Sequence, residues 1–503
     1  MKGKMPLVLC LLLLLSCLSY GRVSQTEVKT SNSLPVHNLS TGLNYTTIQD
    51  AIDANETLDG QTIRVDAGLY NETIKIYKSI SLIGENRDNT ILTAEVTPST
   101  FEHSLVNITA SNVTITDFNL TGFYYEKISV SSCSNVTIRD NTIFSFEICI
   151  GLENSRNCLI TGNTAFGTGL EGNDLIDLSY CTGCVIDNNT VSGSTYYGIT
   201  LFSSSNNLIY NNVISQNQYG IYLTSGTGNI VFHNNFENLN QVTFTGDPSG
   251  NYFNETFEGN YWSDYNGKDA NQDGIGDTPY SNLDFHPLLG TFQDFSVFSP
   301  KEGIQSITAI SNSTVSDLSI EYYVPTNDSV QSDQPFIKFS VTGQNGTTGF
   351  CRLMIPNSIM NSSSYVVFVN NEPVNVNQLP ISNSTVTYLY FTYSQSTHQV
   401  LIFAPEFPSL FILELFFITT LFSAIIYKKK RQNCSLARAM RTQHYSSNFS
   451  NNPISTSATE TVATQMQNIL RLRIETASTH TATTKTGTNA TFRPHAQTRP
   501  YVV

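Results

Sequence analysis

Between residues 112 and 236 the chain repeats a short pattern of apolar and polar positions. An Asn or Gly is followed three residues later by Ile or Val, and eight residues later by another apolar residue. The units start at Asn112, Asn135, Asn157, Gly183, Asn206 and Gly228, at intervals of 22 to 26 residues. Because the units are rich in β-branched residues and Gly, and their apolar positions alternate, the pattern predicts one turn of short strands per unit.

Two columns of apolar residues would fill the interior of such a solenoid, because equivalent positions in stacked coils lie about 4.8 Å apart. The first column contains Ile115, Ile138, Ile160, Ile186, Ile209 and Val231. The second column contains Leu120, Ile143, Ala165, Val191, Ile214 and Phe236. We therefore predict a parallel β-helix whose core consists of these two stacks.

A third column is polar and falls six residues after the start of each unit. It contains Asn141, Asn163, Asn189, Asn212 and Asn234, with Phe118 in the first coil. An Asn at a bend adopts the left-handed conformation at little cost, and its amide can bond to the equivalent amide one coil away. We expect this column to be structural rather than ligand-binding, because buried amides must be satisfied locally.

The segment that precedes the repeat has the pattern of a cap. It reads "YTTIQDAIDANETLDGQTIRVDAGLYNETIKIYKSISLIGENRDNTIL", from Tyr45 to Leu92. Ile48, Ala51 and Ile52 occur at helical spacing, which predicts an amphipathic helix from Thr47 to Ala54 that closes the end of the cylinder. With the three short strands that follow it, this segment resembles the opening of the right-handed parallel β-helix family that includes NosD-type and pectin-lyase-like proteins.

The other end of the repeat carries a second resemblance. "GNYWSDYNGKDANQDGIGDTPY", from Gly259 to Tyr280, is similar to the segment that closes many NosD-like β-helices. The resemblance implies an all-β chain in which residues 41–289 form a right-handed parallel β-helix with an N-terminal helical cap.

After residue 289 the period disappears and a different strand pattern begins. Alternating segments such as "SIEYYV", "FIKFSV", "CRLMIP" and "VTYLYFTYS" are separated by Asn, Gly and Pro turns, which predicts a small antiparallel β-sandwich over residues 290–404. "VTGQNGTTGFCRLMIP" with "YFTYSQSTHQVLIF" resembles a domain often placed just before archaeal membrane anchors. Such a domain would hold the β-helix away from the membrane or contact neighbouring cell-envelope proteins.

Both ends of the chain carry membrane-directed signals. Residues 1–21 have a basic start and a short apolar stretch, which predicts a signal peptide. Ser409 to Tyr427 is a 19-residue apolar run with one acid, followed at once by a basic cluster, which predicts a transmembrane helix. With the tripeptide Pro405-Glu406-Phe407, residues 405–431 resemble the PEF-CTERM sorting signal of archaeal surface proteins, in which an archaeosortase exchanges the helix for a lipid anchor.

The chain departs from that signal in one respect. Such signals end at the basic cluster, whereas a Ser/Thr-rich tail continues here over residues 432–503 and is expected to be disordered. Two interpretations therefore remain open, a lipid-anchored protein and a single-pass protein. Both place residues 22–408 on the extracellular face of the cell membrane.

The net charge of the chain limits the classes of molecule that it can bind. The net charge is -14, and only 13% of residues are charged. This excludes nucleic acid as a partner, because nothing in such a composition neutralises phosphates. Many Asn-x-Ser/Thr sequences occur, which are glycosylation acceptors if the chain is exported and would make it a glycoprotein. Examples are Asn38, Asn44, Asn71, Asn107, Asn135, Asn312 and Asn383.

The closing segment contains a candidate calcium site. Asp269, Asn271, Asp273 and Asp277 occur at positions one, three, five and nine of a loop, with Gly274 at position six. Oxygen ligands at this spacing are typical of the first half of a calcium loop. The twelfth position is Tyr280 instead of Glu, so the loop is not an EF-hand. The alternative is a turn-rich loop whose side chains bond to its own amides.

Two places could support catalysis on a polysaccharide, by lyase or hydrolase chemistry. Stacking places Asp140 in a column with Asp117, beside Arg139, and the coil with the 26-residue interval exposes Asp174 with Asp177 nearby. Neither place matches a known lyase or polygalacturonase signature. Surface acids on an acidic protein are usually only solvated.

Binding of a carbohydrate without catalysis requires only a surface on which sugar rings can stack. Tyrosines near the Gly turns of several coils could form a strip on which sugar rings stack. These are Tyr124, Tyr125, Tyr196, Tyr197 and Tyr219. Alternatively they only fill the turns.

The NosD resemblance also implies copper-enzyme maturation, but clustered His, Met or Cys residues are absent from the sequence pattern. We favour a structural or carbohydrate-binding surface module over a polysaccharide-modifying enzyme. A copper-maturation role ranks third. The expected partners are surface glycans, neighbouring envelope proteins and the membrane.

Overall fold

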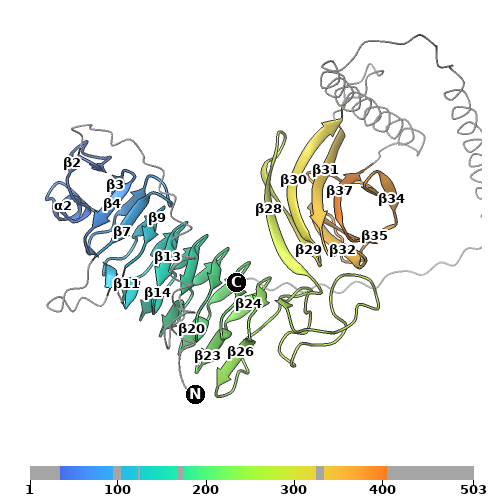
Figure 1. Ribbon diagram of the computed structural model, residues 1–503, viewed down its shortest axis with the longest axis horizontal. Helices are drawn as coiled ribbons and strands as arrows, with labels where there is room; N and C mark the ends of the chain where they lie inside the picture. Colours follow the sequence, from blue (N-terminus) through green and yellow to red (C-terminus); the bar gives the residue numbers. More distant parts are fainter. Residues whose placement is uncertain (1–33, 95–103, 123–124, 168–173, 324–333, 405–503) are drawn as a thin grey trace, which may run out of the picture. The chain divides into compact units, whose positions relative to one another are not determined.

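The computed structural model describes residues 34–94, 104–122, 125–167, 174–323 and 334–404. These residues form three long sheets that wind together as a parallel β-helix, followed by two antiparallel sheets (Figure 1). The predicted all-β fold class is therefore confirmed. The signal peptide, the membrane segment and the Ser/Thr-rich tail predicted from the sequence lie outside the described residues. Among the residues that are described, we find no helix with the length and apolar character needed to cross a membrane.

Each coil of the β-helix contributes one strand to each of three sheets. In spatial order, sheet A contains β2 (Asn44–Tyr45), β1 (Val36–Asn38), β3 (Thr62–Val65), β6 (Ser81–Gly84), β9 (Thr114–Thr116), β12 (Thr137–Arg139), β15 (Leu159–Thr161), β18 (Val185–Asp187), β21 (Leu208–Tyr210) and β24 (Ile230–Phe232). Sheet B contains β27 (Tyr261–Trp262), β25 (Asn235–Glu237), β22 (Val213–Ser215), β19 (Thr190–Ser192), β16 (Thr164–Gly167), β13 (Thr142–Ser145), β10 (Asn119–Leu120), β7 (Thr90–Thr93) and β4 (Gly68–Asn71). Sheet C contains β26 (Asn240–Thr245), β23 (Tyr219–Thr224), β20 (Tyr197–Phe202), β17 (Ile176–Ser179), β14 (Ile148–Glu153), β11 (Glu126–Ser131), β8 (Ser104–Ile108) and β5 (Ile74–Ile76).

The two predicted apolar columns lie in the core of the β-helix, and the inward residues of sheet C, such as Ile199 and Leu201, complete that core. Ile115, Ile138 and Ile160 pair in parallel register in sheet A, and the same column continues to Val231. Every member is at most 1% exposed. The second column is equally buried in sheet B. Stacking in register keeps each branched side chain above its equivalent, so the interior fills without a separate packing solution for each coil.

The polar column forms the predicted ladder. Nδ2 of Asn141 donates to Oδ1 of Asn163 at 3.1 Å, and the same bond repeats from coil to coil as far as Asn260. Each Nδ2 also donates to a backbone carbonyl of the preceding coil, for example from Asn189 to Ile160 at 2.9 Å. The ladder therefore satisfies buried backbone groups as well as its own amides.

One detail of the prediction was wrong. The left-handed residues are not the ladder asparagines but those one position earlier, where φ lies between 54° and 65° in Asp117, Asp140, Gly162, Asn188, Asn211 and His233. The ladder side chain must point inward to reach the neighbouring coil, so the residue before it makes the backbone reversal. Asn, Asp and Gly are frequent there because they tolerate positive φ.

The N-terminal cap is the predicted helix. α2 covers Ile48–Asp53, and the Oγ1 of its N-cap residue Thr47 accepts a hydrogen bond from the Asp50 N–H at 3.1 Å. Ile48, Ala51 and Ile52 are completely buried against the first coils. The helix thus covers the apolar end of the cylinder with its own apolar face.

The other end of the cylinder is covered by aromatic rings. Trp262 stacks on Phe236 with ring centroids 4.5 Å apart, and Tyr280 stacks on Trp262 at 4.4 Å. The Trp262 indole N–H donates to the Asp284 carboxylate at 2.9 Å, and both residues are buried. Flat rings continue the apolar column where the repeat stops.

The two antiparallel sheets form the β-sandwich. One contains β28 (Thr291–Ser299), β29 (Gly303–Ser311), β32 (Thr348–Pro356), β36 (Val386–Ser394) and β35 (Val376–Gln378). The other contains β30 (Thr314–Tyr323), β31 (Gln334–Thr342), β37 (Thr397–Phe403), β33 (Val366–Val369) and β34 (Glu372–Val374). Their shared core includes Ile307, Ile337, Leu353, Leu389 and Val400, all completely buried. β28 and β29 form a long hairpin that was not among the strands predicted from the sequence.

Candidate functional site

The outer surface of sheet C carries acids in its middle coils and tyrosines in the coils that follow. In β20 the inward residues Ile199 and Leu201 belong to the core, so Thr200 between them faces outward. Tyr222 is the equivalent of Thr200 in the next coil, and the Tyr197 ring stacks on it, which places Tyr197 on the same outer surface. We call this surface the acidic–aromatic face. It consists of Glu126, Asp174, Asp177, Tyr197, Tyr219 and Tyr222.

Two aspartates form the centre of this face. Asp174 lies just before β17 and accepts a hydrogen bond from the Thr200 hydroxyl at 3.0 Å. Asp177 lies within β17 and accepts from the Ser179 hydroxyl at 3.2 Å. Burial raises the pKa of Asp174 to about 6. Burial, together with the neighbouring Asp174 charge, raises the pKa of Asp177 to about 7. Both carboxyl groups therefore titrate close to neutral pH.

A third acid approaches the pair because of a glycine. Asp177 pairs with Gly151 on one side and with Thr200 on the other. A Cβ atom on Gly151 would lie 3.0 Å from Oε1 of Glu126, so the glycine makes room for that carboxylate. The negative charge of Glu126 contributes to the raised pKa of Asp177. The sequence pattern did not indicate Glu126, because the outward positions of sheet C depend on strand register.

The tyrosines stack on one another directly beside the acids. The rings of Tyr197 and Tyr222 are parallel within 14°, with centroids 4.5 Å apart. Tyr196 and Tyr219 contact Tyr197 at centroid distances of 4.1 Å and 5.3 Å. Tyr196 is 43% exposed, so the cluster presents ring surface to solvent. Tyr222 was missed by the sequence analysis, although "YGITLF" and "YGIYLT" align it with Thr200.

The remaining predicted tyrosines differ in position. Tyr125 precedes β11 and is 53% exposed, and the charges of Asp174 and Asp177 contribute, after burial and the nearer glutamates, to its raised pKa. It therefore lies near the acids of the face and apart from the tyrosine stack. Tyr124 lies outside the described residues.

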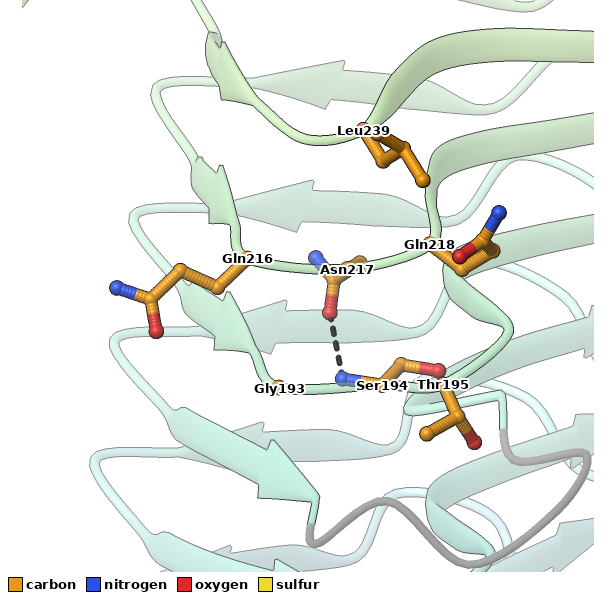
Figure 2. Close-up of a pocket in the computed structure, with 7 residues that line it drawn as sticks. All are labelled: Gly193, Ser194, Thr195, Gln216, Asn217, Gln218 and Leu239. Atoms are coloured by element: carbon orange, nitrogen blue, oxygen red, sulfur yellow. Dashed lines mark hydrogen bonds between the residues drawn. The ribbon is translucent and has the colours of Figure 1, made fainter.

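A shallow groove lies at the bend between sheets B and C (Figure 2). Its volume is about 490 Å³. Its lining includes Ser194 and Thr195, just before Tyr196, and Gln218, just before Tyr219, with Leu239 from the following coil. The Asn217 side chain accepts a hydrogen bond from the Ser194 N–H at 2.9 Å, which holds the two bends together. Hydroxyl and amide groups thus border the tyrosine cluster.

The second catalytic hypothesis lies elsewhere in the coil. Arg139 is the last residue of β12 in sheet A, and Asp140 is a left-handed bend residue that follows it. Nη1 of Arg139 donates to Asp140 at 2.7 Å, and each side chain is 43% exposed. The backbone conformation of the bend accounts for an Asp at this position. The structure does not bring this pair to the acidic–aromatic face.

The four residues of the proposed calcium loop lie together in one turn-rich loop. The Asp269 carboxylate accepts from the backbone N–H groups of Asp273 and Gly274, both at 2.9 Å. Asp277 accepts from the Ala270 N–H at 2.6 Å, and Asn271 donates to Asp273 at 3.2 Å. The loop amides therefore already occupy these side chains. In the part of the chain that the structure describes, no group of three or more His, Cys, Asp or Glu residues is arranged to hold a metal ion.

Comparisons with known proteins agree with the fold. A family model described as "Periplasmic copper-binding protein (NosD)" matches residues 54–267. A cell surface glycoprotein of Methanothermus fervidus is 30% identical over 215 residues, which is 42% of this chain and 30% of the relative. The chain thus matches less than a third of that relative's length. The predicted resemblance to NosD-like β-helix surface proteins is confirmed.

Two solved structures match the chain at low similarity. Pectin methylesterase PemA from Erwinia chrysanthemi has a TM-score of 0.31 and 12% identity, covering 44% of this chain and 86% of the enzyme. Alginate lyase from Paenibacillus sp. str. FPU-7 has a TM-score of 0.27 and 14% identity, covering 40% of this chain and 93% of the enzyme.

The family description names copper, so the cysteines and histidines of this chain are the residues that would have to bind it. All six cysteines in the described ranges are buried free thiols, five of them inside the β-helix. His233 is bonded to Glu258 at 2.9 Å, and His37 lies 3.1 Å from Asp66. Since no described cluster offers three suitable ligands, these residues do not fit a copper centre.

Proposed function

We propose that the chain is an exported, membrane-anchored cell-surface protein whose β-helix binds carbohydrate on the acidic–aromatic face. The sequence signals at residues 1–21 and 405–431 support export and anchoring. Similarity to a cell surface glycoprotein supports the same location. The sandwich would then separate the β-helix from the lipid, so that sheet C meets glycans of the cell envelope.

One observation carries the binding proposal, namely the stacked rings of Tyr197 and Tyr222 next to Asp174 and Asp177. Sugar rings pack their C–H faces against aromatic rings, and their hydroxyl groups bond to carboxyl groups. Carboxyl groups with pKa values near 6 and 7 both donate and accept hydrogen bonds at neutral pH. Because these carboxyl groups carry negative charge at neutral pH, the combination suits a neutral polysaccharide better than an acidic one.

A glycan array with the detergent-solubilised full chain tests the binding proposal. Tyr197→Ala and Tyr219→Ala should each weaken the hits about tenfold, because each removes stacking surface worth about 1.4 kcal/mol. Tyr252→Ala is the matched control, since Tyr252 is 61% exposed but lies outside the face. An array on which the unsubstituted chain gives no hits speaks against the proposal, as does an equal loss in the control.

A polysaccharide lyase or hydrolase is the second candidate, favoured by the raised pKa values of Asp174 and Asp177. A carboxyl group that is protonated near neutral pH can act as general acid, and one that is ionised can act as general base. Incubation with the glycans that bind should then release shorter products, detected by mass spectrometry. Asp174→Asn and Asp177→Asn should abolish product formation, whereas Asp140→Asn should not. Loss only in Asp140→Asn would instead support the Arg139–Asp140 pair.

If the glycan array gives no hits and no shorter products are released, a structural role in the cell envelope is the remaining function. Copper-enzyme maturation stays the third hypothesis, with no ligand set among the described residues to support it. Mass spectrometry of the mature C-terminus distinguishes the two modes of anchoring. Cleavage near Pro405 would indicate a lipid anchor, and an intact Val503 would indicate a single-pass protein.

A further inference from the structure

Two large apolar side chains stand exposed at the tip of the β28–β29 hairpin. Phe298 pairs with Ile304 across the hairpin, and the two are 68% and 75% exposed. The next outward pair is Ser296 with Ser306, and Asp294 follows. The outer side of the hairpin is therefore apolar at its tip and polar behind it.

This tip lies at the end of the sandwich where the described chain ends. The Ser299 hydroxyl is 3.3 Å from the Tyr322 hydroxyl near the end of β30. Tyr322 pairs with the start of β31, next to Phe336. Phe336 in turn pairs with Phe403, the last residue of β37, and their rings are 5.1 Å apart. The hairpin tip and the exit of the chain thus share one end of the sandwich.

The opposite end of the same hairpin contacts the β-helix. The Asn235 side chain donates to the Phe292 carbonyl and accepts from the Phe292 N–H, both at 2.8 Å. From Phe292 to Phe298 an extended strand covers about 20 Å. The sandwich therefore has one end at the β-helix and the other at the hairpin tip.

Chain length limits the distance from this tip to the predicted membrane span. Five peptide units separate Ala404 from Ser409, where the apolar run starts. Even fully extended they cover only about 17 Å. A sandwich on so short a connection cannot stand far from the lipid surface if the span is inserted.

We propose that this end of the sandwich rests on the membrane surface, with Phe298 and Ile304 inserted in the interfacial region of the bilayer. The inference rests on the proposed membrane anchor. Apolar side chains at the interface gain burial that water does not offer, and aromatic residues are enriched at that depth. The turn between them contains one cation, Lys301, and one anion, Glu302, both exposed, and an ammonium group at this depth can pair with lipid phosphates. The contact orients the β-helix relative to the membrane and does not merely tether it.

Tryptophan fluorescence in vesicles tests this contact with the full chain. Phe298→Trp is reconstituted into phosphatidylcholine vesicles whose acyl chains are brominated or unbrominated. The single natural tryptophan, Trp262, is 1% exposed inside the β-helix end and supplies a constant background, measured with the unsubstituted chain. We expect the added fluorescence to fall at least twofold in brominated vesicles. Ile304→Trp should give the same result, and it also keeps the test valid if one variant misfolds.

Leu69→Trp is the matched control, because Leu69 is 69% exposed at the far end of the β-helix. Its fluorescence should be equal in both kinds of vesicle. In one outcome the Phe298→Trp chain still floats with the vesicles after alkaline washing, but its tryptophan emission is red-shifted and is not quenched by bromine. This result overturns the contact and leaves the anchor intact. Blue-shifted emission without bromine quenching also overturns it, and indicates that protein, such as a second copy, covers the tip. A chain that does not float with vesicles refutes the anchor and the contact together.

Discussion

Arg352 donates two hydrogen bonds to the same oxygen of Glu258, from Nε at 2.9 Å and from Nη2 at 2.7 Å, although 94 residues separate them in the chain. Arg352 belongs to the sandwich strand β32, whereas Glu258 lies just after the last full coil. His233 bonds to the other carboxylate oxygen at 2.9 Å. The side chain of Arg352 is 2% exposed, so this ion pair is buried.

Removing one partner should therefore be costly. Glu258→Gln removes the nearer counter-charge of the buried Arg352 guanidinium and leaves only Asp273, 4.0 Å away, which we expect to lower the free energy of unfolding by about 3 kcal/mol. Urea unfolding monitored by Trp262 fluorescence measures the change. Glu255→Gln, an exposed position three residues earlier, should change stability by less than about 0.5 kcal/mol. Equal effects of the two variants would refute the importance of the ion pair.

The same pair predicts a dependence on acid. Burial acts to raise the pKa of Glu258, but the His233 hydrogen bond and the Arg352 charge outweigh it and hold the pKa below its usual range. A lowered pKa means that the stabilisation is present above the unfolded-state value of about 4.3 and is lost as pH falls through the folded-state value. The stability difference between the unsubstituted chain and Glu258→Gln should therefore shrink as the pH falls below about 4. A difference that persists into strong acid would contradict this assignment.

Asp177→Asn should stabilise the protein at alkaline pH. Because burial and Asp174 raise the pKa of Asp177 to about 7, folding costs free energy once the carboxyl group ionises, and this cost develops between about pH 4 and pH 7. We expect the variant to be about 1–3 kcal/mol more stable at pH 8 and nearly unchanged at pH 4. Thermal unfolding at the two pH values measures this, while glycan binding should weaken. Equal effects at both pH values would show that ionisation of Asp177 does not lower the free energy of unfolding.

The Asn ladder should resist substitution far more than the bend residue beside it. Asn189→Ala removes the acceptor of the Asn163 amide and a donor to two backbone carbonyls, so buried groups lose their partners. We expect a loss of about 3 kcal/mol in urea unfolding. Asn188→Gly preserves the left-handed backbone and removes only the hydrogen bond from Nδ2 to the Asp187 carboxylate, so it should cost about 1 kcal/mol. Comparable losses would indicate that the ladder is not a principal source of stability.

The closing loop predicts little response to chelation. Its aspartates accept hydrogen bonds from the loop's own amides, so the loop has satisfied backbone groups without a cation. Addition of EGTA should therefore shift the melting temperature by less than about 1 °C, a change too small for the loss of a bound ion. A drop of several degrees, restored by calcium, would instead establish the calcium site predicted from the spacing of Asp269, Asn271, Asp273 and Asp277.

The sequence by itself determined the β-helix core. Ile138, Ile160 and Ile186 recur at nearly constant spacing, and each coil packs mainly on the coils next to it in the chain. Local repetition then fixes which residues stack, because the side-chain packing of one coil is repeated in every other coil. The amphipathic cap from Thr47 to Ala54 was predictable because its apolar face packs only on the end of the cylinder and depends on no distant segment.

Only the tertiary structure decided where the acids of sheet C lie and how the sandwich attaches. The meeting of Glu126 with Asp177 depends on strand register in coils of unequal length, and on the space left by Gly151. The contact of Arg352 with Glu258 joins segments without shared periodicity. Such contacts depend on the path of the chain between distant segments, whereas a repeating pattern records only what neighbouring coils require of each other.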